Sequence, residues 1–228
     1  MSQISIIGTG NMARTLGTLA LRGGHTVEIV GRDRAKATEL AKALGGQASA
    51  GTWGAAPSGE IVIVALLHDA VVPAVAAYGE ALAGKIVVDI SNPFNATFDG
   101  LAHGEHTSVA QEVAKAAPPS ARVVKAFNTI FRPVLEGGRP DVFLAGDDAQ
   151  AKASVATFVE TIGLRPLDVG EGGDVATAAQ QRRGEAEREG CREEPPPRGG
   201  ECGEHRAGGD RQRRHDQRGD DARPHQER

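Results

Sequence analysis

The stretch ISIIGTGNMA, residues 4–13, decides the fold of this chain. A short apolar run, 4–7, leads into the pattern GxGxxA at 8–13, and apolar side chains then recur at helical spacing as far as Leu21. In this pattern the first glycine permits a tight turn and the second lets a phosphate approach the backbone. The alanine permits close packing of a helix on a strand. The stretch therefore predicts a strand, a glycine turn and a helix.

The alternation of strand and helix continues along the chain. Apolar runs predict strands at 27–30, 61–67, 86–90, 122–126 and 142–144, and helices at 33–44, about 69–78 and about 149–162. Strands that are apolar throughout are covered on both faces, as in a parallel sheet. This order predicts an α/β fold with a Rossmann-type, doubly wound and mostly parallel sheet. We expect the ligand to lie beyond the carboxyl ends of the strands.

The chain changes character near Gly170. From Glu171 to Arg228 it has no Leu, Ile, Met, Phe, Trp or Tyr, so this segment cannot bury enough apolar surface to form a core. We divide the chain into a nucleotide-binding domain, residues 1–170, and a low-hydrophobicity tail, residues 171–228, which we expect to be disordered. Because Arg, Gly, Ala and Pro have GC-rich codons, we interpret the switch as out-of-frame reading of a GC-rich gene, with an evolved disordered tail as the alternative.

Composition argues against several functional classes. Apolar residues make up 39% of the chain and the formal net charge is -4, so no basic field favours nucleic acid. We expect no membrane partner, and the first strand begins without a leader pattern, which predicts a cytoplasmic location. Two cysteines and three histidines in the tail match no compact zinc spacing, so no metal site is expected: they are Cys191, Cys202, His205, His215 and His225.

The second strand indicates which dinucleotide is bound. Dinucleotide sites for NAD usually place a carboxylate where this chain reads VGRDR, residues 30–34. Gly31 leaves room, and Arg32 can form a bidentate pair with a 2′-phosphate, which predicts NADP(H). The alternatives are that Arg32 and Lys36 are the solvated start of a helix capped by Asp33, or that Asp33 turns toward a ribose.

Polar residues follow two later strands. Asn92 comes after the strand at 86–90, and Asn128 and Thr129 come after the strand at 122–126. One interpretation places these three residues beside a nicotinamide ring, and the other makes them turn caps. His68 has no carboxylate partner fixed by sequence, so we interpret it as a packing or surface residue and assign no catalytic residue.

Several motifs in a fixed order carry a family resemblance. They are GTGNM at 8–12, GR at 31–32, VVKAFNT at 123–129, GDD at 146–148 and GLRPLD at 163–168. Together they resemble NADP oxidoreductases that depend on the 8-hydroxy-5-deazaflavin coenzyme F420, and the related cytosolic domains of membrane ferric reductases. The resemblance in organisation extends over about residues 3–170.

The resemblance assigns roles to the candidate residues. It implies that the turn contacts the pyrophosphate, that Arg32 and Lys36 contact the 2′-phosphate, and that the nicotinamide side is formed by residues from three later loops. The pyrophosphate residues are Gly8, Thr9, Gly10, Asn11 and Met12, and Gly31 accompanies Arg32. The nicotinamide residues are Leu66, Leu67 and Asn92, with Asn128 and Thr129 near the site of hydride exchange.

The resemblance also implies a reaction. Hydride passes directly between the nicotinamide and a deazaflavin or flavin ring, so the protein supplies orientation rather than acid-base chemistry. Such proteins continue after the position of Gly170 with an apolar helical region that completes the second-cofactor site and a homodimer contact, and this chain does not.

Three functions are therefore carried forward. The first is an NADP(H)-dependent oxidoreductase acting on a deazaflavin or flavin, and the second is a non-catalytic NADP(H)-binding module or inactive remnant. The third is another nicotinamide enzyme on the same fold, such as an imine reductase or a hydroxyacid dehydrogenase, because fold does not fix chemistry.

Overall fold

The computed structural model describes residues 1–94 and 108–171. The chain divides into two units, residues 1–188 and 189–228, and every described residue lies in the first. The expectation of a disordered tail, together with the cysteines and histidines of that tail, lies outside the described residues.

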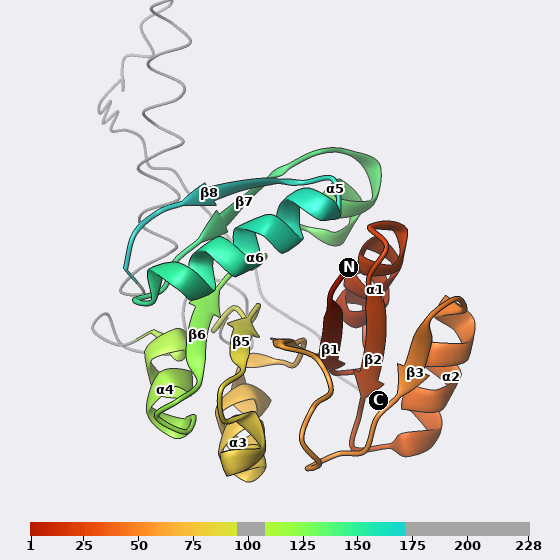
Figure 1. The fold of residues 1–228 in the computed structure, drawn as a ribbon, viewed down its shortest axis with the longest axis horizontal. Coiled ribbons are helices and arrows are strands. Elements are labelled where there is room, and N and C mark those ends of the chain that lie inside the picture. The colour runs from red at the N-terminus through yellow and green to blue at the C-terminus, as the bar shows by residue number, and fades with distance from the viewer. Residues whose placement is uncertain (95–107, 172–228) are drawn as a thin grey trace, which may run out of the picture. The chain divides into compact units, whose positions relative to one another are not determined.

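Six parallel strands form the main sheet (Figure 1), in the order β3-β2-β1-β4-β5-β6. The strands are β1 (Gln3–Ile7), β2 (Thr26–Val30), β3 (Ala48–Ala50), β4 (Ile61–Val64), β5 (Ile86–Asp89) and β6 (Arg122–Lys125). The chain order reverses between β1 and β4, which is where a doubly wound sheet opens a crevice beyond its carboxyl ends. The predicted Rossmann-type fold is confirmed.

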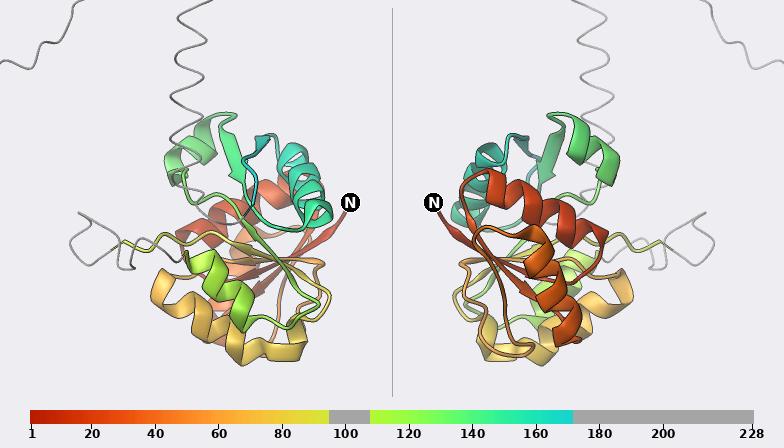
Figure 2. Two further views of the ribbon diagram at one scale, coloured as in Figure 1. Left: turned by 90° about the vertical axis from the view of Figure 1, so that its left-hand side faces the viewer. Right: turned by 90° about the vertical axis from the view of Figure 1, so that its right-hand side faces the viewer.

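Helices connect the strands. They are α1 (Asn11–Arg22), α2 (Arg34–Leu44), α3 (His68–Tyr78), the short 3₁₀ helix η1 (Gly79–Leu82), α4 (Val109–Ala116), α5 (Arg132–Gly137) and α6 (Ala149–Thr161). The helices α1 and α2 cover one face of the main sheet, and α3 and α4 cover the other (Figure 2).

Alternate residues along each strand divide the apolar core between the two faces of the sheet. Ile4 and Ile6 of β1 pack in the core that contains α1, α2 and α6, whereas Ile7 packs in the core that contains α3 and α4. In β4, Ile61 and Ile63 face the first core, and 62 and 64 face the second. Side chains that alternate between two helical layers explain why β4 is apolar at every position.

The carboxyl-terminal strands differ from the expectation. β7 (Asp141–Leu144) pairs in parallel with β8 (Arg165–Asp168) in a two-stranded sheet, joined to β6 by an antiparallel bridge between Lys125 and Ala145. The strand predicted at 142–144 therefore lies outside the main sheet. The strands β3 and β8 were not predicted, because the segments ASA and RPLD carry no apolar run.

The fourth strand is shorter than predicted. It ends at Val64, and the amide of Ala65 makes one more hydrogen bond, 2.8 Å to the carbonyl of Ile7. Since β1 ends at Ile7 and the glycine turn follows, the residues after Ala65 have no residue of β1 to pair with. The helix α3 then begins at His68.

Candidate nucleotide-binding site

The turn between β1 and α1 leaves an open surface at the start of a helix. Gly8 has φ +138°, and a Cβ there would lie 2.3 Å from the carbonyl oxygen of Ala65, so only glycine fits. Nothing lies within 4 Å of a Cβ placed on Gly10, and no side chain caps the N-terminus of α1. The first backbone N–H groups and the helix dipole are thus available to an anion, which fits a pyrophosphate.

The side chains of this turn point in different directions. Asn11 is exposed, whereas Met12 is partly buried and packs against the apolar core. A Cβ on Gly31 would lie 2.8 Å from the Cγ2 atom of Thr9. The room left by Gly31 is therefore occupied by Thr9, and the two motif loops pack directly on each other.

The loop after β2 carries both a helix cap and an unpaired arginine. Asp33 Oδ1 accepts hydrogen bonds from the amides of Ala35, at 2.9 Å, and Lys36, at 3.2 Å, so the carboxylate caps α2. Lys36 Nζ lies 3.9 Å from Asp33 Oδ2 on the surface. Arg32 is exposed, and within the part of the chain that the structure describes no carboxylate pairs with it. Arg32 is thus available to a phosphate.

A pocket of about 410 Å³ lies beside Arg32. It is lined by Arg32, Trp53, Leu66, Asp69, Ala70, Pro73 and Ala74. The ring of Trp53 is held edge-on against Tyr78 with the centroids 5.3 Å apart. This volume and lining suit a small aromatic ligand group such as a purine. Leu66 therefore shares a pocket with Arg32, whereas the resemblance implied that Leu66 lines the nicotinamide side. The side chain of Leu67, the next residue, is 79% exposed.

The two predicted asparagines lie together at the carboxyl ends of β5 and β6. Asn92 Nδ2 donates to the carbonyl of Asn128 at 2.6 Å, and Asn128 Nδ2 donates to Asn92 Oδ1 at 3.4 Å. These contacts join loops that are 36 residues apart in sequence. Both asparagines thus hold the two loops together.

A buried ion pair lies at the same strand ends. Lys125 Nζ is 2.7 Å from Asp89 Oδ2, and the two side chains are 7% and 0% exposed. Lys125 also donates to the carbonyl of Ser91, and Asp89 Oδ1 accepts from the amide of Ser91 at 2.9 Å. No local pattern in the sequence pairs these two residues. The missing signal is register, because Asp89 and Lys125 are directly opposite each other on adjacent strands.

Three buried polar atoms near this pair lack partners among the described residues. They are Ser91 Oγ, Asn128 Oδ1 and Thr129 Oγ1. Buried polar groups are nearly always hydrogen-bonded, so these atoms indicate a polar group supplied from outside the described chain. A carboxamide, which both donates and accepts, fits this set.

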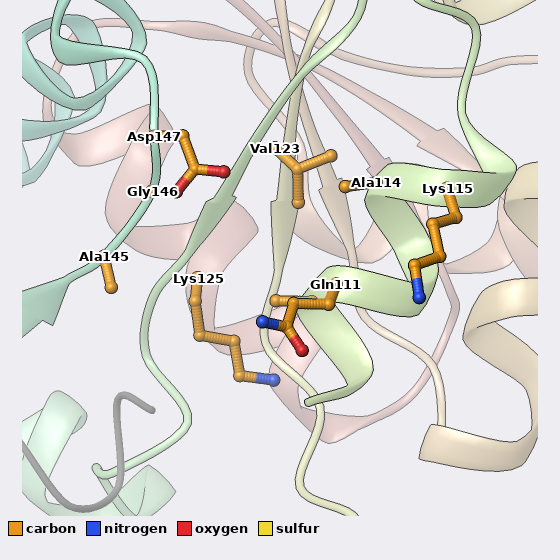
Figure 3. A pocket seen from close by; sticks show the side chains of 9 residues that line it. Gln111, Ala114, Lys115, Val123, Lys125, Ala145, Gly146 and Asp147 are labelled. Carbon is orange, nitrogen blue, oxygen red and sulfur yellow. The ribbon is translucent and has the colours of Figure 1, made fainter. Parts of the chain in front are cut away.

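A second pocket, of about 400 Å³, lies between α4, β6 and the loop after β7. Figure 3 shows Gln111 of α4, Lys125 of β6 and Asp147 of the loop among its side chains. It meets the strand ends only through Lys125, so we assign no ligand to it.

The order of the strands and the glycine turn after β1 define a Rossmann-type α/β domain. Residues 3–93 match the family described as NADP oxidoreductase coenzyme F420-dependent, which confirms the resemblance carried by the motifs. Over 172 residues the chain is 30% identical to the metalloreductase STEAP3 of Rattus norvegicus, a match that covers 74% of this chain and 34% of that protein. The chain thus spans about a third of its curated relative.

Solved structures show the same fold. A hypothetical protein, SMa0349, of Sinorhizobium meliloti is 28% identical with a TM-score of 0.66, over 75% of this chain and 86% of that one. A reductive aminase from Aspergillus terreus, in complex with NADPH and ethyl-5-oxohexanoate, is 22% identical with a TM-score of 0.57, over 84% and 62%. At this identity the second likeness shows the fold alone. The matching family and the curated relative are both oxidoreductases by name.

Among the helices of residues 1–94 and 108–171, none combines the length and the apolar content needed to span a bilayer.

Proposed function

We propose that this protein binds NADP(H) and supports hydride transfer between the nicotinamide and a deazaflavin or flavin ring. The observation that carries the proposal is the set of unpaired groups at the carboxyl edge of one sheet. The uncapped start of α1 follows β1, the unpaired Arg32 follows β2, and the unpartnered polar atoms follow β5 and β6. An NADP molecule offers a pyrophosphate, a 2′-phosphate and a carboxamide to these three places.

Each part of the site has a distinct role in this proposal. The backbone at Gly10 and the start of α1 hold the pyrophosphate, and Arg32 pairs with the 2′-phosphate. Trp53 and Leu66 enclose the adenine, whereas the cluster that includes Ser91 orients the nicotinamide. When bound, the dinucleotide supplies the hydride chemistry, and the chain contributes orientation and exclusion of water.

The exposed apolar side chains favour a flat ring as second substrate. Apart from Met1, the large apolar residues that are exposed in the described chain are Leu67, Phe94, Phe131 and Val134. Leu67 follows β4, Phe94 follows β5, and the other two follow β6. Exposed apolar groups at a ligand-binding edge mark a surface that is covered in use. A deazaflavin or flavin ring would cover it, whereas a small polar substrate would not.

The proposal is tested by mixing the protein with NADPH and an oxidised deazaflavin, or a flavin, and following the absorbance of both rings. Turnover with either ring supports hydride transfer. Tight NADPH binding without turnover favours the second candidate, a non-catalytic NADP(H)-binding module. The variant Leu67→Asp tests the exposed apolar surface: it is expected to keep NADPH binding and to lose turnover with the second ring.

A further inference from the structure

The buried pair Lys125–Asp89 holds the Ser91 turn through both of its backbone groups. The Lys125 ammonium binds the carbonyl of Ser91, and the Asp89 carboxylate binds its amide. Both backbone groups of Ser91 are therefore hydrogen-bonded to the ion pair. The hydroxyl of Ser91 is buried and has no partner among the described residues. A side chain that is 4% exposed and unpartnered points to a ligand group.

We propose that Lys125 and Asp89 are positioning residues for the nicotinamide. They fix the Ser91 turn after β5 beside the loop of Asn128 and Thr129 after β6, so that the unpartnered oxygen atoms of both loops are available to one carboxamide. This inference rests on the proposed NADP(H) function and adds to it two residues that do not touch the dinucleotide.

Stability alone does not account for the pair. Taking two charges out of water costs several kcal/mol per ion, and well-packed apolar residues of similar volume are often as stable as a buried ion pair. What an apolar pair cannot do is bind the amide and the carbonyl of one residue at once. The pair thus provides a defined conformation of the Ser91 turn, which an orienting site requires.

The chain contains a matched control for this arrangement. Lys152 Nζ lies 2.9 Å from Asp168 Oδ1 and 3.1 Å from the carbonyl of Gly170, so it also joins an aspartate and a backbone carbonyl. This contact ties α6 to the end of β8, and neither residue lines the strand ends where Ser91 and Asn128 lie. Lys152→Met removes the same kind of contact at a place the proposal does not use.

The experiment compares two ligands with the full chain. NADPH carries the nicotinamide. The second ligand, 2′-phospho-ADP-ribose, lacks the nicotinamide but keeps the pyrophosphate, the 2′-phosphate and the adenine. Calorimetry gives both dissociation constants for wild type, K125M, K152M and the double variant D89N/K125M. The double variant leaves no buried charge unpaired, so it remains informative if K125M alone does not fold.

We expect wild type and K152M to bind NADPH more tightly than 2′-phospho-ADP-ribose. K125M and D89N/K125M should lose about tenfold in NADPH affinity, as expected when a few hydrogen bonds to one ring are no longer aligned, with 2′-phospho-ADP-ribose unchanged. The fluorescence enhancement of bound NADPH, which reports an immobilised ring, should fall in the same variants.

Other outcomes separate the two claims. Equal losses for both ligands in the variants, or a full NADPH advantage in D89N/K125M, would overturn the positioning role. Equal binding of both ligands by wild type would also overturn it, while leaving NADP(H) binding intact. If wild type binds neither ligand, the proposed function itself fails.

Discussion

At the residue scale, we propose that Arg32 determines which dinucleotide binds. Arg32→Ala should weaken NADPH binding by about 1.5–3 kcal/mol, roughly tenfold or more, because a phosphate–guanidinium pair is lost. NADH affinity should not change, since NADH lacks the 2′-phosphate. Calorimetry with both nucleotides checks this, and Arg34→Ala, at the first residue of α2 and outside the pocket, is the matched control. A parallel loss for both nucleotides in R32A would instead indicate a disturbed loop.

Gly10 tests the pyrophosphate site. Gly10→Val should abolish binding of NADPH and NADH alike, because the new side chain fills the approach that is now empty. Its backbone is extended with φ -84°, so the sheet should still fold, which circular dichroism can verify. Undiminished binding of both nucleotides by the folded variant would refute this site.

His25 links two elements and makes their contact sensitive to pH. The side chain is 4% exposed just before β2, with Nε2 2.7 Å from the hydroxyl of Thr161 at the end of α6. Its ring packs edge-on against Phe158. Burial lowers the pKa of His25 below the ordinary value of 6.5. The neutral ring is therefore the form that fits between these elements.

The sign of the pH effect follows from that lowered pKa. The unfolded chain takes up the proton near pH 6.5 and the folded chain only at lower pH, so this stabilisation is complete above 6.5. It is lost as the pH falls through the folded pKa. His25→Leu should cost about 1–3 kcal/mol at pH 7.5, and its disadvantage should shrink toward pH 5. Urea unfolding at several pH values checks this.

A second variant separates titration from the hydrogen bond. Thr161→Val removes the contact to Nε2 but leaves the buried imidazole. It should be less stable than wild type and keep the pH dependence. A disadvantage of His25→Leu that stays constant from pH 7.5 to pH 5 would contradict the role of His25.

The whole-molecule prediction concerns the division into two domains. All residues assigned to the dinucleotide lie between Gly8 and Thr129, and Gly170 is held by its carbonyl, which accepts from the amide of Gly146 at 3.1 Å. A chain ending at Glu171 should therefore bind NADPH as tightly as the full chain. Limited proteolysis of the full chain should likewise remove the tail and spare binding. Loss of binding on trimming would show that the tail contributes to the site.

The sequence by itself determined the features that depend on contiguous residues. The strand, glycine turn and helix at 4–21, the cap at Asp33 and the exposed Arg32 each follow from a few neighbouring side chains, because turns, helix periods and caps are local. The alternating order of strands and helices then restricts the sheet to very few topologies.

Only the tertiary structure decided how distant segments meet. The pairing of Asp89 with Lys125, the packing of Thr9 on Gly31 and the place of Leu66 beside Arg32 join residues that the sequence separates by more than 20 positions. The same holds for β8: the segment RPLD has no strand pattern in its sequence, and it forms a strand by pairing with β7. The physical reason is that strand register and side-chain packing are fixed by burial against partners remote in sequence, which no local pattern encodes.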